Sequence, residues 1–330
     1  MERESWVDQV KTIACLGVVI VHLFQSMVKS GLLQGNYPYL LLESIGHNTF
    51  VQLFFLCSGY LYQKYSRVNS VQSWKENVIK KAIILGIPYF TFTTITWALK
   101  MLSHDYVNEK PEGLFEALFI RPIGQYWFLY ILFFIFVITP TIRNTKDACI
   151  IAGIAVCMRI ISILSGDLIK IHLISNIMEW EFWFVAGMLL SLLHWDVYKG
   201  RALGAVCGVL FIILNIKTMN SGVRMLKWGK EVLACASIIL LMYRRENNRF
   251  FRTLLPYTMP IYLMHTIAAA TMRVILSIVG LFGAAIQIPL GLAASIVGPI
   301  IAMTVLKAMK LDFIVDPRPI LKWRNRVSRK

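Results

Sequence analysis

One histidine lies deep in the first long apolar run of the sequence, KTIACLGVVIVHLF, where an ionisable side chain is costly. This residue, His22, follows Lys11 by eleven positions. Eleven steps of 100° in an α-helix end about 20° past three full turns, so the two side chains share one helix face, about 16 Å apart along the axis. We expect Lys11 near the cytoplasmic surface of a membrane and His22 in the outer half of the bilayer.

This spacing suits a reaction with a long anionic donor. A cation at the wet end of the helix can hold the phosphates of the donor, and a neutral imidazole at depth can take a proton from an acceptor hydroxyl. A plainer interpretation is also open. Lys11 is then an ordinary positive flank of a membrane helix, and His22 forms a hydrogen bond with a neighbouring helix.

The next apolar run, FVQLFFLCSGYLYQ, contains the small pair Ser58 and Gly59. Such a pair can admit a substrate or a backbone close to the helix axis, or it can be a packing notch or a kink. A group of basic residues follows before the segment IPYF and includes Lys80 and Lys81. It is either a solvated cytoplasmic loop or a clamp for phosphate groups.

Four further residues of chemical interest lie at or within later apolar runs. Trp127 is typical of an interface anchor, and His265 is a second histidine at membrane depth. Arg159 and Arg273 lie within predicted helices, where a charged side chain needs a partner. Glu179 and Glu181 are the carboxylates in the sequence that could pair with them. A buried histidine with satisfied hydrogen bonds is the plain alternative for His265.

The elements that position these residues must span a membrane. Apolar residues make up 57% of the 330 residues, charged residues only 16%, and the mean hydropathy is +0.62. An ordinary soluble domain is about 45–50% apolar and about 25% charged. The composition excludes a plain cytosolic enzyme, a disordered chain and a disulfide-stapled secreted domain.

The pattern of apolar runs predicts an all-α, polytopic integral membrane bundle with about ten transmembrane helices, each needing about 20 mostly apolar residues. The runs are 10–28, 46–63, 82–100, 125–142, 148–165, 180–194, 202–217, 231–243, 257–280 and 286–308. We therefore expect a membrane-embedded domain over residues 1–308 and a basic cytoplasmic C-terminal tail over residues 309–330.

Charge distribution predicts the orientation. The chain has 34 Lys and Arg against 18 Asp and Glu, for a net charge of +16. With the N-terminus inside, 23 of the 34 basic residues lie in cytoplasmic segments and 9 in outer loops, which favours a multi-pass protein with both termini in the cytoplasm. The loop around Lys217, Arg224, Lys227 and Lys230 runs against this rule. No nucleic-acid-binding motif accompanies the charge, so no nucleic-acid partner is expected.

Several enzyme classes are excluded by missing motifs. The sequence contains no HExxH, P-loop, GxGxxG after a strand, or GxSxG. This excludes zinc proteases, nucleotide hydrolases, dinucleotide-binding enzymes and serine hydrolases of those types. The six cysteines fall in apolar runs without a CxxC pair, so we expect small buried side chains and neither a disulfide framework nor a metal site.

Several segments together resemble the membrane acyltransferase-3 family, whose members O-acylate cell-envelope carbohydrates. The matching segments are RESWVDQVKTIACLGVVIVH, FVQLFFLCSGYL, KKAIILGIPYF, YWFLYIL and IYLMH. They run from residue 3 to residue 265, and Asp8 three positions before Lys11 is closest to the fucose 4-O-acetylase-like branch. The resemblance also implies a bacterial cytoplasmic membrane.

The resemblance implies roles for individual residues. His22 matches the essential histidine of the family's first helix. Lys11 stands where many members carry arginine, which keeps the charge but loses the planar fork that binds phosphate in a bidentate manner. Lys80 and Lys81 match the basic cluster that meets the acyl-CoA donor. The motif and substrate-pocket positions are Ser58, Gly59, Tyr60, Trp127 and His265.

Two functional hypotheses follow. The first is an O-acyltransferase that moves an acetyl or similar short acyl group from acyl-CoA, a co-substrate, to a carbohydrate hydroxyl, with His22 as general base or as transient acyl carrier. No permanently bound cofactor and no oligomeric state are predicted, and the partners are acyl-CoA, a carbohydrate acceptor and the lipid bilayer. The alternative is a transporter or flippase for a polysaccharide or lipid-linked sugar, although the sequence has no pair of broken helices at matching positions in two halves. A purely structural role leaves Lys11 and His22 without a purpose.

Overall fold

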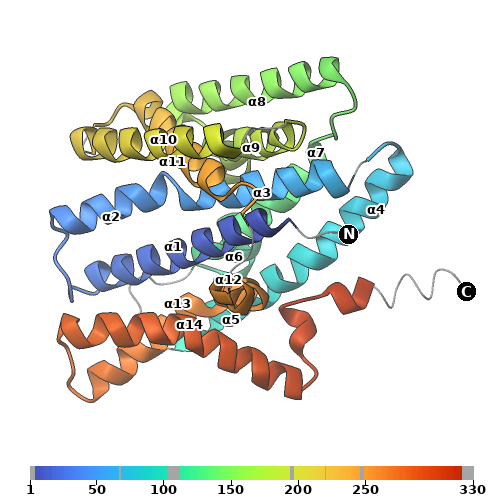
Figure 1. The fold of residues 1–330 in the computed structure, drawn as a ribbon. Coiled ribbons are helices and arrows are strands. Elements are labelled where there is room, and N and C mark those ends of the chain that lie inside the picture. The colour runs from blue at the N-terminus through green and yellow to red at the C-terminus, as the bar shows by residue number, and fades with distance from the viewer. Residues whose placement is uncertain are drawn as a thin grey trace, which may run out of the picture. The chain divides into compact units, whose positions relative to one another are not determined.

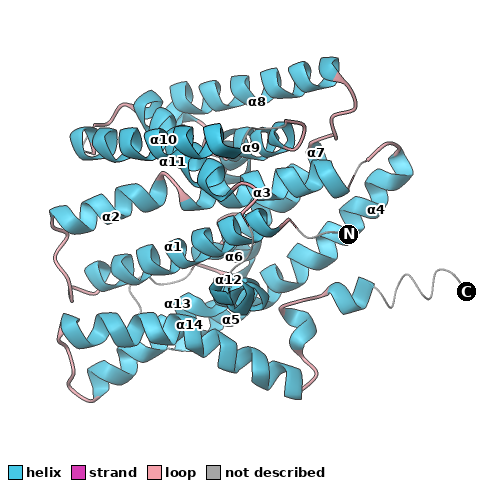
Figure 2. Ribbon diagram, in the orientation of Figure 1, coloured by secondary structure: helices cyan, strands magenta, loops and turns pink. Residues whose placement is uncertain are grey.

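The computed structural model describes residues 4–66, 68–102, 112–193, 197–219, 221–245 and 249–321. Within these ranges all regular secondary structure is helical (Figure 2). The predicted all-α class is therefore confirmed. Figure 1 labels the helices along the chain. The chain divides into two compact units. The first is Met1–Val21 with Gln34–Arg67 and Thr141–Thr258, and the second is His22–Leu33 with Val68–Pro140 and Met259–Lys330.

The first unit contains the beginning of helix α1 (Ser5–Lys29) and six longer helices. These are α2 (Tyr37–His47), α3 (Phe50–Tyr65), α8 (Thr145–Ser165), α9 (His172–Leu190), α10 (Val197–Thr218) and α11 (Arg224–Met242). The short helices η3 (Gly166–Leu168), α12 (Arg249–Leu254) and η4 (Leu255–Tyr257) complete it. Helix α9 packs against both α3 and α8, and α10 packs against α11.

Two glycines allow α3 and α9 to approach each other closely. A Cβ atom on Gly59 would lie 1.9 Å from the carbonyl oxygen of Phe184, and one on Gly187 would lie 1.9 Å from the carbonyl oxygen of Leu56. Both obstacles are backbone atoms, which cannot move aside as a flexible side chain can. The two helices therefore meet backbone to backbone at this crossing, as small residues permit in membrane helices.

The second unit contains the end of α1 and the remaining helices. These are α4 (Val71–Lys81), the π-helical turn η1 (Ala82–Gly86), α5 (Ile87–Leu102), α6 (Leu114–Phe119), η2 (Gly124–Tyr126), α7 (Trp127–Ile138), α13 (Thr258–Ile278), α14 (Ala284–Ala308) and η5 (Asp312–Ile314). The N-cap of α4 is Ser70, whose side chain forms a capping box with Ser73. Pro88 is the second residue of α5, two positions after the π turn, and proline there lacks a backbone N–H and would crowd a preceding regular α-helical turn.

Each of the ten predicted apolar runs overlaps a helix, but the run 46–63 crosses the break at Asn48 and Thr49 between α2 and α3, and the run 125–142 ends four residues after α7. Among the described residues, eight helical segments are long and apolar enough to cross a membrane, and the segment Gly124–Ile138 is apolar but shorter. The predicted runs 180–194, 202–217 and 231–243 were too short, because α9, α10 and α11 begin earlier, in polar sequence. Helix α11 begins with three basic residues and a glutamate and is not among the eight.

Much apolar surface is exposed along α8 and α10. Ile154 on α8 is 55% exposed and Val209 on α10 is 60% exposed. Such surface is rare on soluble proteins but suits helices that face lipid. The prediction that all cysteines are buried is wrong for Cys149 and Cys157, because α8 packs mainly against α9 and both cysteines lie on its exposed surface. Of the predicted tail, residues 322–330 lie outside the described residues.

Candidate active site

Two histidines from different helices meet in the second unit. The Nδ1 atom of His22 on α1 lies 3.0 Å from the Nε2 atom of His265 on α13. Their rings are nearly parallel, with 14° between the planes and 5.3 Å between the centroids. His265 is buried, with 1% of its surface exposed. Sequence alone placed both residues at membrane depth but did not pair them.

The backbone determines which nitrogen of each ring carries a proton. The Nδ1 atom of His265 lies 2.9 Å from the carbonyl oxygen of Ile261 and 3.0 Å from that of Tyr262. Because a carbonyl oxygen only accepts, Nδ1–H of His265 must donate, and its Nε2 in the neutral ring carries a lone pair. That lone pair accepts the Nδ1–H of His22. The Nε2 atom of His22 is then the basic nitrogen of the pair.

The turn of α13 that carries His265 is held by η2, directly before α7. Gln125 donates from Nε2 to the Leu263 carbonyl at 3.2 Å and to Thr266 Oγ1 at 3.0 Å. The Tyr126 hydroxyl also donates to the Leu263 carbonyl, at 2.9 Å. The Tyr262 hydroxyl in return donates to the Gln125 carbonyl. Sequence reasoning missed Gln125 and Tyr126, although a glutamine and a tyrosine directly before the apolar run at Trp127 were an available signal.

Lys11 lies in the first unit, on the same continuous helix α1 as His22. It is partly buried and forms no hydrogen bond or ion pair within the described part of the chain. The helical spacing predicted for Lys11 and His22 is therefore present along α1. A partly buried ammonium group without an anionic partner is suited to bind a phosphate group.

Lys80 and Lys81 form the last turn of α4, directly before the π turn. Lys80 is exposed, and the Nζ atom of Lys81 lies 3.5 Å from the centroid of the Phe136 ring, a cation–π contact. Both residues lie in the second unit. π turns are frequently found at functional sites in helices.

The predicted motif at Ser58, Gly59 and Tyr60 lies in the first unit. The Ser58 hydroxyl donates to the Phe54 carbonyl of its own helix at 2.7 Å, and Gly59 faces the backbone of α9. These contacts favour the packing-notch interpretation of Gly59. Tyr60 is buried, and its ring centroid lies 4.9 Å from that of Trp6.

An ion pair between Glu4 and Lys64 lies beside Tyr60. The Nζ atom of Lys64 also donates to the Tyr60 hydroxyl at 3.3 Å. Burial raises the pKa of Glu4, but the hydrogen bond from Lys64 and its charge lower the pKa by more than burial raises it. The pKa of Glu4 therefore lies below its ordinary value. The carboxylate of Glu4 is therefore ionised at neutral pH, and the pair ties the start of α1 to α3.

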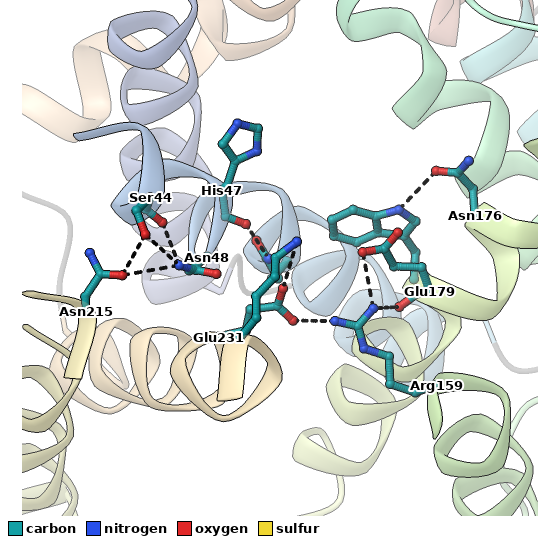
Figure 3. A network of polar contacts seen from close by, with 11 residues as sticks. Ser44, His47, Asn48, Arg159, Asn176, Glu179, Asn215 and Glu231 are labelled. Atoms are coloured by element: carbon teal, nitrogen blue, oxygen red, sulfur yellow. Dashed lines mark hydrogen bonds and ion pairs between the residues drawn. The ribbon is translucent and has the colours of Figure 1, made fainter. Parts of the chain in front are cut away.

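Arg159 finds its partners within the first unit (Figure 3). Its guanidinium lies 2.7 Å from Glu231 and 3.2 Å from Glu179. Arg159 and Glu231 are almost fully buried, with side chains 4% and 1% exposed. Glu179 was one of the two partners that the sequence offered, and Glu231, 72 positions away, was missed. A neighbouring hydrogen bond joins Ser44 to Asn215, so polar contacts link α2 and α10 as well.

Trp127 is the first residue of α7 and is partly buried. Whether it anchors the helix at a membrane interface, as predicted, stays a prediction. The structure thus brings His22 and His265 together in the second unit, to which Lys80 and Lys81 also belong. Lys11, Ser58, Gly59 and Tyr60 belong to the first unit.

Fold and site together define a polytopic helical membrane protein with an oriented histidine pair. Comparison with protein families gives a match to a model described as an acyltransferase domain, over residues 4–304. The chain belongs to the acyltransferase 3 family and is a membrane acyltransferase. Comparisons with curated proteins and with solved structures found no match.

Proposed function

We propose that this protein transfers an acetyl or similar short acyl group from acyl-CoA to a hydroxyl group of a cell-envelope carbohydrate. The observation that carries the proposal is the chain of hydrogen bonds from the Ile261 and Tyr262 carbonyls through His265 to His22. This arrangement leaves a basic nitrogen on an oriented ring, which is the arrangement that a general base in acyl transfer requires. Asp8 three positions before Lys11 in the first helix supports the fucose 4-O-acetylase-like branch as the first acceptor class to test.

In the proposed reaction, Nε2 of His22 takes the proton of the acceptor hydroxyl as its oxygen attacks the thioester carbon. The carbon–sulfur bond then breaks, and the departing CoA thiolate takes the proton from the His22 imidazolium. The acyl ester and free CoA are the products, so the imidazole returns to its neutral state. His265 accepts the Nδ1–H of His22 throughout and stabilises the transient positive charge, as the partner of a catalytic histidine does in other enzymes.

Three lysines are proposed to contact the donor. Lys11 is a partly buried cation on the helix of His22, and Lys80 and Lys81 form the last turn before the π turn. Phosphate groups of CoA bind such ammonium groups through charge-assisted hydrogen bonds. The donor then enters from the cytoplasm, in agreement with a cytoplasmic membrane location and both termini on the inner side.

His265 is proposed as a positioning residue. We expect His265→Met to lower kcat about 10²- to 10⁴-fold, because His22 can then adopt the other tautomer. His265→Gln is expected to retain more activity, because its amide oxygen can accept the Nδ1–H of His22. Steady-state kinetics of both purified variants test this order. Equal kcat values for wild type and His265→Met would exclude the positioning role.

Labelled acetyl-CoA tests the donor. Purified wild-type protein in detergent is given labelled acetyl-CoA with L-fucose glycosides, other sugars and a membrane extract. We expect transfer by wild type and a KM for acetyl-CoA about 10- to 100-fold higher in Lys11→Ala, because a hydrogen bond to a charged group is worth about 1.5–3 kcal/mol. Lys29→Ala, at the other end of α1, is the matched control. If wild type neither binds nor consumes acetyl-CoA, the proposed donor is wrong.

A further inference from the structure

A small cavity lies one helical turn beyond His22 on α1, within the second unit. Its polar lining consists of Ser26, Arg273 and Gln287, from α1, α13 and α14. Apolar side chains, including Leu23 and Met27, form the rest. The volume is about 10 Å³, which is close to the space that a single water-sized oxygen needs. Ser26 follows His22 by four positions, so the cavity and the histidine lie along the same part of α1.

Among the described residues, the hydrogen-bond partners of the Arg273 cation are neutral. Its guanidinium donates to the carbonyl oxygen of Ser26 at 3.1 Å and to the hydroxyl of the same residue. No carboxylate forms an ion pair with Arg273 within the part of the chain that the structure describes. A charged residue in a membrane helix is costly unless it is paired or has a function. The remaining N–H groups of Arg273 are therefore suited to a substrate atom.

Gln287 supplies a hydrogen-bond acceptor to the same cavity. Its side chain is buried, with 1% exposed, and its Nε2 donates to the Leu281 carbonyl at 2.9 Å. That bond defines which end of the amide is oxygen. The Oε1 atom of Gln287 is buried and has no hydrogen-bond partner among the described residues. An unsatisfied buried acceptor is costly, so a ligand that donates a hydrogen bond is expected here.

The two groups together select the chemistry of the ligand. An ionised carboxylate would satisfy Arg273 but cannot donate to Gln287. A hydroxyl group accepts from a guanidinium and donates to an amide oxygen at the same time. The size of the cavity also fits one oxygen atom rather than a larger group.

We propose that Arg273 and Gln287 form an acceptor subsite that holds a second hydroxyl of the carbohydrate whose first hydroxyl is acylated at His22. This inference rests on the proposed function. It makes Arg273 and Gln287 determinants of which hydroxyl of a sugar is acylated, because they fix the sugar relative to the base.

The test compares loss of the protein group with loss of the substrate group. Methyl α-L-fucopyranoside and methyl α-D-glucopyranoside are used with their monodeoxy analogues, in which one hydroxyl is replaced by hydrogen. For wild type, we expect one deoxy analogue to lower kcat/KM about 10- to 100-fold. Arg273→Gln should lower kcat/KM for the parent glycoside by a similar factor, because its KM for the glycoside rises. Its KM for acetyl-CoA should stay within about twofold of the wild-type value. The same deoxy analogue should cause no further loss in this variant.

Two further variants keep the test decisive. Gln287→Met removes the hydrogen-bond acceptor Oε1 but keeps the charge of Arg273. It replaces Arg273→Gln in the same comparison if that variant does not fold. Arg121→Gln removes an exposed arginine, paired with Glu112 in the same unit, and is the matched control. The subsite is rejected if the deoxy analogue lowers kcat/KM in Arg273→Gln by the same factor as in wild type. It is also rejected if Arg273→Gln has the wild-type kcat/KM for the parent glycoside. A wild type without acetyl transfer rejects the proposed function, and the subsite with it.

Discussion

His22→Gln is expected to lower the rate of acyl transfer about 10²- to 10⁴-fold while the protein stays folded. Glutamine keeps an N–H that can donate to Nε2 of His265, so the contact between α1 and α13 is retained. It has no basic nitrogen, so it cannot take the proton of the acceptor hydroxyl. The measurement is kcat for transfer from labelled acetyl-CoA, on protein that is monodisperse in detergent.

Two comparisons make this result specific. His47→Ala removes a largely exposed histidine from α2, in the first unit, and should leave the rate unchanged. Rapid quenching of wild type with labelled acetyl-CoA, without acceptor, distinguishes a base from an acyl carrier, because only a carrier leaves label on the protein. A fully active His22→Gln variant would remove His22 from the reaction.

The largest loss of stability is expected for Arg159→Met. Glu231 is 1% exposed, and without the guanidinium at 2.7 Å it would be a buried carboxylate that has lost its closest partner. Breaking a buried ion pair from one side costs about 3–5 kcal/mol. We expect a lower unfolding temperature in detergent, measured by loss of monodisperse protein on heating.

Replacing both members of the pair is expected to restore most of this loss. Well-packed apolar side chains in place of a buried ion pair are often neutral or stabilising, so Arg159→Met with Glu231→Leu should unfold near the wild-type temperature. Lys227→Met is the control, because the Lys227 ammonium is 47% exposed and lies 3.8 Å from Glu231. Its effect should be below about 1 kcal/mol. If Arg159→Met is as stable as wild type, the pair does not stabilise the first unit.

Helix positions were largely predictable from the sequence, because long apolar runs leave few alternatives in a membrane. The beginnings of α9, α10 and α11 were not. Residues such as Asn176 and Lys227 interrupt the apolar pattern, yet the backbone hydrogen bonds of the helices continue through them. High hydropathy indicates contact with lipid, so it does not identify the part of a helix that extends into polar surroundings.

The site was predictable residue by residue but not as pairs. Sequence indicated His22, because a histidine in an apolar run is unusual, and it noted His265 for the same reason. Their contact joins residues 243 positions apart and depends on how α1 and α13 pack, which no local pattern encodes. The same holds for Arg159 with Glu231 and for Arg273 with Ser26.

The π turn at Ala82–Gly86 has a consequence for the way this segment tolerates change in length. A π turn contains one residue more than the α-helical turn it replaces, so α4 and α5 are out of phase by about 100°. Lys80 and Lys81 therefore face a direction that the apolar periodicity of α5 does not determine. Deleting one residue between 82 and 86 would convert the π turn into an ordinary α-helical turn, so both lysines would keep their direction while Tyr89 and Phe92 kept their packing. The same deletion elsewhere in α4 or α5 would instead rotate the residues before it by about 100° relative to those after it.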